Sequence, residues 1–385
     1  MAQIRTAVSR ATWTFLLWLL SCCAVQPALA QPSQPADDRP QTGPISGYMD
    51  FHFNHDQGAD PVLDFHRFVL LFNHSFTSRL RFVGELEVEH ALVEGLEEKG
   101  ELEVEQAFID FLLSRSVNVR AGMLLVPVGI INERHEPPVF NGVERPFVDT
   151  VIVPTTWFDV GFGVHGEVGN GFRYRAYAMA PLDALEFTAE DGIREGQQKG
   201  AEANVRNLAF TARGEYVGIR DLTVGASIWT GESSFAVARL DTTVRVLEAD
   251  ARYQRGPFEG RAQFAQVGIG DAGPLNEAIQ RLTGVSPNIA STLRGWYGEA
   301  AYRVWDRGAP RDLVTFIRYE NFDTQYRMPD GYLPLKQFDR EAWIVGITYY
   351  PDPDIAVKAD YVWTRNQSSL VRGPNSVNIG LGWWF

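Results

Sequence analysis

The last nine residues of the chain carry large apolar side chains at alternate positions. In Val377–Phe385 every second residue is apolar, and the positions between them up to Gly382 are small or polar. Successive side chains of a β-strand point to opposite faces, so the pattern predicts a strand with one apolar and one polar face. Such a strand suits a wall between lipid and water, with Trp383 and Phe385 in an interfacial aromatic belt. The alternative is an edge strand of a soluble sandwich.

The amino terminus predicts export. Arg5 and Arg10 precede an apolar stretch over residues 11–25, and Ala28–Ala30 has the small-x-small pattern of a peptidase site. We therefore expect residues 1–30 to be a signal peptide.

Cysteine usage agrees with an exported chain. Both cysteines, Cys22 and Cys23, lie in the predicted signal, so the mature chain has no thiol for a disulfide or a metal site. A lipoprotein cleavage box with an acylated Cys22 is the alternative. Residues 31–44 are rich in Pro, Gln and Asp and predict a polar periplasmic linker, which leaves residues 45–385 as one folded domain.

The folded domain repeats a unit of strand, short turn and strand, with longer loops between the units. One pair of alternating segments, 343–349 and 355–363, is joined by Pro351–Asp354, and similar pairs recur upstream. After the signal no apolar run reaches the length of a membrane helix, so only a closed barrel can span a membrane. We count about sixteen strands and predict an all-β, transmembrane antiparallel barrel in the bacterial outer membrane. A barrel of this size has room for an aqueous channel.

Charge and motifs exclude several functions. Removal of Arg5 and Arg10 from the 35 basic residues leaves 33, against 48 acidic ones, and this balance argues against nucleic acid as a partner. Neither Gly-x-Ser-x-Gly nor His-Glu-x-x-His occurs. His52 and His55 are three apart and face opposite sides of a strand, and we expect the seven histidines to be wall or interface groups. We predict no catalytic residue, cofactor or metal site, with an outer-membrane enzyme as the alternative.

One predicted outer loop, residues 125–157, stands out because it is far longer than a normal barrel connection. In strand order it is the third outer loop, and loops of this length are usually functional. We expect it to fold into the lumen and to set the field across the bore. A solvated surface loop is the alternative. Its charged and titratable residues are Glu133, Arg134, His135, Glu136, Glu144, Arg145 and Asp149.

Strand parity turns both basic and acidic side chains toward the predicted lumen. The arginines can form a ladder that binds oxyanions, or they can pair with carboxylates of the same parity and brace the wall. We expect bracing for most of them. The lumen-facing set is Arg81, Glu85, Glu87, Arg173, Arg175, Arg213, Arg252, Arg261, Arg303 and Arg318.

A family resemblance lies in the same region. Residues 122–129 read Gly-Met-Leu-Leu-Val-Pro-Val-Gly, which resembles the Gly-x-Phe-Lys-x-Pro-Phe-Gly segment of phosphate-selective porins, and residues 153–163 resemble that family's entry into the next strand. The resemblance implies a homotrimeric outer-membrane porin, a passive water-filled channel for small hydrophilic or ionic solutes, including anions such as phosphate. Leu125 occupies the position of the family lysine, and the chain has only four lysines. Phosphate specificity is therefore not carried over.

Partners follow from the barrel. We expect contact with outer-membrane lipid and recognition of the terminal strand by the barrel assembly machinery, through Leu381, Trp383 and Phe385. A structural or adhesive barrel with a blocked lumen remains an alternative, because residues 275–282 have a helical pattern and can plug the mouth.

Overall fold

The computed structural model describes residues 45–90, 100–234, 240–305 and 312–385. The predicted signal peptide (1–30) and linker (31–44) lie outside the described residues. Within the described ranges the chain forms sixteen strands: β1 (Ile45–Asp56), β2 (Val62–Thr77), β3 (Leu80–Glu89), β4 (Leu102–Leu112), β5 (Asn118–Leu125), β6 (Phe158–Val168), β7 (Phe172–Met179), β8 (Ala209–Ile219), β9 (Leu222–Glu232), β10 (Thr243–Arg255), β11 (Phe258–Ile269), β12 (Thr292–Arg303), β13 (Asp312–Arg327), β14 (Asp339–Asp352), β15 (Ile355–Asn366) and β16 (Ser376–Trp384).

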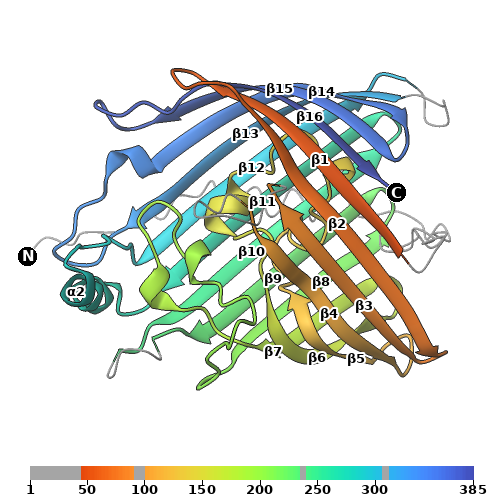
Figure 1. Cartoon of the computed structure of the whole chain (residues 1–385), viewed down its shortest axis with the longest axis horizontal. Helices are drawn as coiled ribbons and strands as arrows, with labels where there is room; N and C mark the ends of the chain where they lie inside the picture. The colour runs from red at the N-terminus through yellow and green to blue at the C-terminus, as the bar shows by residue number, and fades with distance from the viewer. Residues whose placement is uncertain (1–44, 91–99, 235–239, 306–311) are drawn as a thin grey trace, which may run out of the picture. The chain divides into compact units, whose positions relative to one another are not determined.

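The strands form a closed antiparallel barrel (Figure 1). Each strand pairs with its neighbours in the chain, and β16 pairs with β1, where Phe51 lies opposite Leu381 and Met49 opposite Trp383. Reciprocal backbone hydrogen bonds of 3.0 and 2.9 Å between Gly47 and Phe385 complete the seam. Closure leaves no unpaired strand edge, which a barrel wall in lipid requires. The prediction of an all-β, sixteen-stranded antiparallel barrel is confirmed.

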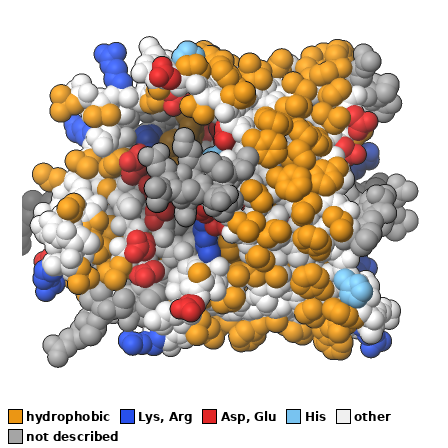
Figure 2. Space-filling view, in the orientation of Figure 1, with side chains coloured by type: hydrophobic (Ala, Val, Ile, Leu, Met, Phe, Trp, Pro, Cys, Tyr) orange, Lys and Arg blue, Asp and Glu red, His pale blue; other side chains and the backbone are white. Residues whose placement is uncertain are grey.

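The two faces of the wall differ in polarity. Phe162 in β6 and Phe210 in β8 point outward and are 55% and 58% exposed, whereas Thr211 and Arg213, which share the inner face of β8, are buried. This alternation is the period of two expected for strands. Figure 2 shows apolar side chains spread over the strands of the visible face. An apolar outer face is what a lipid-facing barrel presents. Among the described residues, no helix has the length and apolar character needed to cross a membrane.

Connections at one end of the strands are short and those at the other end are long. Residues 256–257 turn β10 into β11, whereas residues 126–157 join β5 to β6 and residues 180–208 join β7 to β8. The expected helical stretch is part of α2 (Ala272–Thr283), in the connection between β11 and β12. The long connections also contain short helical turns: η1 (Pro137–Val139), η2 (Val148–Ile152), η3 (Ala184–Glu186), η4 (Arg194–Gly196) and η5 (Lys336–Phe338).

Part of the interior is apolar, which the sequence analysis did not anticipate. Residues of the long connections pack with inward-facing residues of β9–β13 in one buried cluster. Its wall members include Trp229, Val246 and Val267, and α2 contributes Leu275 and Ile279. Contacts of this kind stabilise the loops inside the barrel by removing apolar surface from water.

Candidate functional site

The connection 126–157, which we call the third loop, lies inside the barrel and contacts its inner wall. The Ile130 N–H donates to Gln263 Oε1 of β11 (2.8 Å), and the Val148 N–H donates to Glu320 Oε2 of β13 (3.0 Å). The Val143 N–H donates to Asp360 Oδ2 of β15 (2.6 Å). These bonds attach the loop to three strands of the wall, as expected for a loop folded into the barrel.

A buried lysine supports the same loop. Lys358 of β15 is 2% exposed, and its Nζ donates to the carbonyl oxygens of Phe140 and Gly142 at 2.8 Å each. The Nζ also lies 3.9 Å from the centre of the Phe140 ring. A buried ammonium is tolerable only with such partners, so the loop and the lysine stabilise each other. In the sequence alone, Lys358 is one of four lysines with no local signal of this role.

Asn132 holds the two ends of the loop together. Its Nδ2 donates to the carbonyl oxygens of Val126 (2.7 Å) and Trp157 (2.9 Å), and its Oδ1 accepts from the Trp157 N–H (2.8 Å). The Trp157 ring packs on Trp229 of β9 with a 5.2 Å centroid separation. Asn132 is buried and satisfies backbone groups that would otherwise lack partners. Nothing local in the sequence indicated this role.

Gly129 allows the close packing of the loop on itself. Its φ of +81° lies in the left-handed region, and a Cβ there would lie 2.9 Å from Asp149 Oδ1. Any other residue would be strained in this conformation and would crowd the carboxylate.

The seven charged and titratable loop residues do not form one cluster. Glu133 Oε1 lies 3.0 Å from Arg175 Nε of β7, and Glu144 Oε1 lies 3.0 Å from His52 Nδ1 of β1. Arg145 donates to Thr155 Oγ1 within the loop (2.9 Å). The others are Arg134, within electrostatic range of Glu215 and Arg252, half-buried Glu136, and the buried His135 and Asp149.

Asp149 is buried and incompletely hydrogen-bonded. Its Oδ1 accepts from Gln263 Nε2 (2.7 Å), and its Oδ2 has no hydrogen-bond partner among the described residues. Burial, with a further contribution from the charge of Glu320, raises the pKa of Asp149 to about 7, although the bond from Gln263 acts in the opposite direction. Loss of hydration disfavours the carboxylate form.

The inner-wall arginines are paired with carboxylates. Arg213 is buried and contacts Glu215, Glu248 and Asp250, while Arg318 contacts Glu299 and Glu320. Each predicted lumen-facing arginine has a carboxylate oxygen within 4.0 Å, and these are Arg81, Arg173, Arg175, Arg213, Arg252, Arg261, Arg303 and Arg318. Of the predicted acids, Glu87 contacts Arg67, and Glu85 accepts from Gln106. Such pairing is the arrangement that bracing requires.

A cavity of about 520 Å³ lies at the long-loop end, between the third loop and β13–β16. Glu144, Arg145 and Phe147 of the loop line one side of it. Charges of both signs surround the space, namely Arg145, Arg318, Arg340, Arg372, Asp56, Glu144, Glu190 and Asp360. Fixed charges of both signs around a narrow space produce a strong local field.

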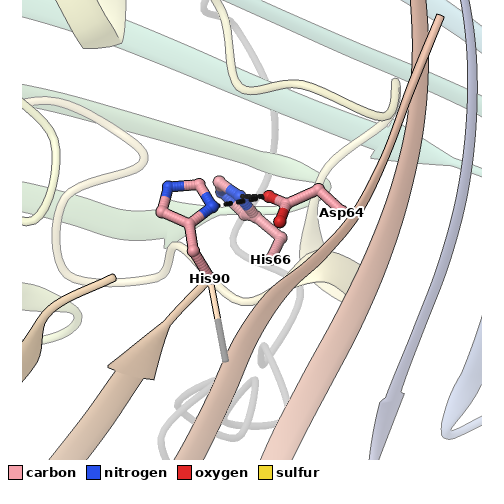
Figure 3. Close-up of side chains that lie close together, drawn as sticks. All are labelled: Asp64, His66 and His90. Atoms are coloured by element: carbon pink, nitrogen blue, oxygen red, sulfur yellow. Dashed lines mark hydrogen bonds and ion pairs between the residues drawn. The ribbon is translucent and has the colours of Figure 1, made fainter. Parts of the chain in front are cut away.

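Three histidines gather near the same end of β1–β3. In Figure 3, His66 and His90 both point toward Asp64, with Nδ1 to Oδ2 distances of 3.1 and 2.7 Å. His52 stacks on His66 at 4.5 Å. The register between β1 and β2 shifts here, between Asp50 and His52. A bulge of this kind changes the direction of side chains, so the alternation along β2 does not predict to which face His66 points.

Comparison with known proteins identifies one relative by sequence. No family model matches the chain. An uncharacterized protein of Aquifex aeolicus is 35% identical over 326 residues, which cover 83% of this chain and 74% of the relative. The chain belongs to the same family as this Aquifex protein.

Several solved structures share the fold of this chain, although their sequence identity to it is low. OmpF of Salmonella typhi, solved in complex with daunomycin, has a TM-score of 0.60 at 14% identity over 89% of this chain and 97% of OmpF. The outer membrane channel DcaP of Acinetobacter baumannii has a TM-score of 0.58 at 13% identity, over 89% and 96%. The anion-selective porin of Comamonas acidovorans has a TM-score of 0.55 at 13% identity, over 89% and 98%. The barrel is therefore porin-like, which confirms the broader part of the resemblance.

Proposed function

We propose that this family member is an outer-membrane porin, a passive water-filled channel for small hydrophilic or ionic solutes. The observation that carries the proposal is a closed sixteen-stranded barrel with the third loop bonded across its interior beside a charged cavity. A barrel of this strand number is wide enough for an aqueous path. The solved structures of similar fold are described as channels and porins, which supports a channel rather than an enzyme.

The third loop is proposed to set selectivity. Glu144 and Arg145 face the cavity, and Arg318 and Asp360 lie on the wall side. We propose that solutes pass between these groups and that anions such as phosphate are among them. The arginines around the cavity support anion passage, but the pairing of arginines with carboxylates along the wall weakens the case for a phosphate-selective ladder.

A blocked barrel is the second candidate. The apolar cluster formed by the third loop, α2 and the inner faces of β9–β13 fills part of the outer half of the interior. If this packing extends across the whole lumen, the protein acts as a structural or adhesive barrel and conducts nothing.

Assembly and location complete the proposal. OmpT of Vibrio cholerae, which shares the fold with a TM-score of 0.55 at 11% identity, is described in a trimer form. We propose a homotrimer in the outer membrane, inserted by the barrel assembly machinery through β16. Native mass spectrometry in detergent, with a mass of one chain or of three, tests the oligomer.

Single-channel recording in a planar bilayer tests the function. Discrete conductance steps after insertion are expected of a porin. Silence, with insertion verified by protease protection, would favour the blocked barrel. The reversal potential under a salt gradient then gives the charge preference of a conducting protein.

A further inference from the structure

A second group of ionisable residues is enclosed between the third loop and the opposite wall. Glu85 and Glu87 of β3, Glu105 of β4 and His135 of the loop are 4%, 1%, 0% and 3% exposed. Donor atoms of Glu85, Glu105 and His135 all lie within 4.8 Å of one another. Burial of several carboxylates together is costly unless cations compensate them.

A bulge brings Glu105 into this group. Glu85 pairs with Gln106 and Leu86 pairs with Val104, so Glu105 is an extra residue in β4. Such an insertion lets two successive side chains point to one face, and Gln106 accordingly donates to Glu85 from the same side. The local strand geometry thus directs a third carboxylate toward Glu85 and Glu87.

The imidazole of His135 is oriented as a metal ligand would be. Its Nδ1 lies 3.0 Å from the Asn132 carbonyl oxygen, which can only accept, so Nδ1 carries the hydrogen. A backbone carbonyl on one ring nitrogen is the arrangement that usually fixes the tautomer of a metal-binding histidine. In the neutral tautomer the other nitrogen, Nε2, presents its lone pair toward Glu105, whose Oε2 is 3.2 Å away, whereas a protonated ring would form an ion pair there.

The facing atoms lack hydrogen bonds. His135 Nε2 and the buried Tyr48 hydroxyl have no hydrogen-bond partner among the described residues, and the neighbour in reach of the Glu105 carboxylate besides His135 is another carboxyl group, Glu87. Buried polar atoms almost always have one. His135 Nε2 and Glu105 Oε2 therefore lie close together without a hydrogen bond, as two ligand atoms directed at a common metal ion would.

We propose that Glu85, Glu105 and His135 bind a divalent transition-metal ion, for which Zn²⁺ is the reference. Two donors that each lie about 2.1 Å from zinc are about 3.4 Å apart in a tetrahedral site, close to the separation of Nε2 and Oε2. Glu87 pairs with the Arg67 guanidinium, which also contacts Glu89, so the two proposed ligand carboxylates, Glu85 and Glu105, carry two negative charges that a dication balances. The imidazole favours a transition ion over Ca²⁺ or Mg²⁺, which prefer oxygen ligands.

The ion would attach the third loop to β3 and β4. His135 comes from the loop and the carboxylates come from the wall, so the metal joins parts that are about 30 residues or more apart in the chain. This role goes beyond conduction and departs from our expectations that the histidines are wall or interface groups and that the chain has no metal site.

The histidines around Asp64 are a weaker candidate. His66 and His90 already direct nitrogens at the same Asp64 oxygen, and His90 is exposed. Ordinary hydrogen bonds account for that arrangement, which makes His66→Ala a matched control.

Metal content of the refolded full-length barrel tests the proposal. The protein is folded in detergent with Zn²⁺ or, separately, Mn²⁺, dialysed, and analysed by mass spectrometry of the metal; heat-dependent electrophoretic mobility verifies folding. We expect one ion per wild-type chain and at least about tenfold weaker binding in Glu105→Gln and His135→Ala, with His66→Ala unchanged. X-ray absorption of the wild type should show one nitrogen donor among oxygen donors.

Three results would overturn the proposal, and the first two do not depend on how the variants fold. The first is a folded wild type that retains neither ion, and the second is retention with an absorption spectrum that lacks the nitrogen donor. The third is retention that, among the folded variants, only His66→Ala removes. In that event protonation of the carboxyl groups accounts for the cluster.

Discussion

The third loop contacts two walls of the barrel in different ways. Toward β11–β15 its backbone N–H and carbonyl groups meet side chains of matching polarity, such as Asp360, Glu320 and Lys358. Toward β3 and β4 it presents the His135 imidazole to the buried carboxylates of Glu85 and Glu105, of which Glu85 accepts a hydrogen bond from Gln106. Hydrogen bonds within the chain suffice on the first wall, whereas the second wall needs a proton or a cation in addition. The attachment of the loop to β11–β15 therefore needs only the chain itself, whereas its attachment to β3 and β4 depends on pH or on a bound cation.

Asp149 is the exception on the self-sufficient side, and Asp149→Asn should have the largest effect. The raised pKa means that the folded barrel binds a proton that the unfolded chain releases, so stability is fully present below about pH 4 and falls as the pH rises to about 7. The Asn amide is uncharged like the protonated acid, so the variant does not lose stability as the pH rises. We expect the variant to be more stable at pH 8 by up to about 4 kcal/mol and nearly unchanged at pH 4.

Urea unfolding of the barrel in detergent at both pH values measures the difference. Asp241→Asn is the control, because that carboxylate is exposed and contacts only its own loop region. An equal gain at pH 4 and pH 8 would contradict the burial of a charged carboxylate at position 149.

Lys358→Met should break the attachment on the same wall. The thioether cannot donate, so the carbonyl oxygens of Phe140 and Gly142 lose their buried donor, at a cost of about 3 kcal/mol. We expect a lower midpoint of urea unfolding and, if the protein conducts, larger and noisier conductance steps. Lys336→Met removes an exposed ammonium and should change neither quantity. An unaffected midpoint in Lys358→Met would show that the loop does not depend on this contact.

Asn132→Ala tests how the loop is held to itself, because the Asn132 side chain joins its two ends. The bond from His135 goes to the backbone carbonyl of residue 132, which the variant keeps. Loss of the Asn132 side-chain bonds should cost about 2 kcal/mol and speed hydrogen exchange across residues 126–157. Mass spectrometry of exchange-labelled peptides gives the measurement. Asn207→Ala, at an exposed site, is the control. Unchanged exchange in the loop would mean that wall contacts alone hold it.

The sequence predicted the barrel because its signals are local. Alternation and turn residues lie within each hairpin, as in β14 and β15, and the alternation of the terminal strand required no knowledge of its partner β1. Loop length likewise identified residues 125–157. The apolar inner wall had one visible signal, since Val246 and Leu247 are adjacent and cannot share a face of β10.

The details of the site depend on contacts that no local pattern contains. Glu105 points inward only because β4 bulges, and a bulge shifts the parity on which the sequence analysis relied. Lys358 meets Phe140 across more than 200 residues. Asn132 is one of many polar loop residues until the ends of the loop are placed together.

The smallest expected effect concerns selectivity. Replacement of Arg134 and Arg145 by Ala removes two positive charges near the proposed path, and a unit charge about 8 Å away in water changes the energy of an ion by about 0.5 kcal/mol. We therefore expect the permeability ratio to shift toward cations by about twofold for each charge, as read from the reversal potential under a salt gradient. Arg115→Ala, at the short-turn end, removes an exposed charge paired with Glu167 and serves as the control. Arg145 also donates to Thr155 within the loop, so its replacement can move the loop as well as remove a charge. The single variants are therefore measured separately. A shift confined to Arg145→Ala would assign the path to the cavity beside β13–β16, whereas no shift in either would place both arginines away from the path of the ions.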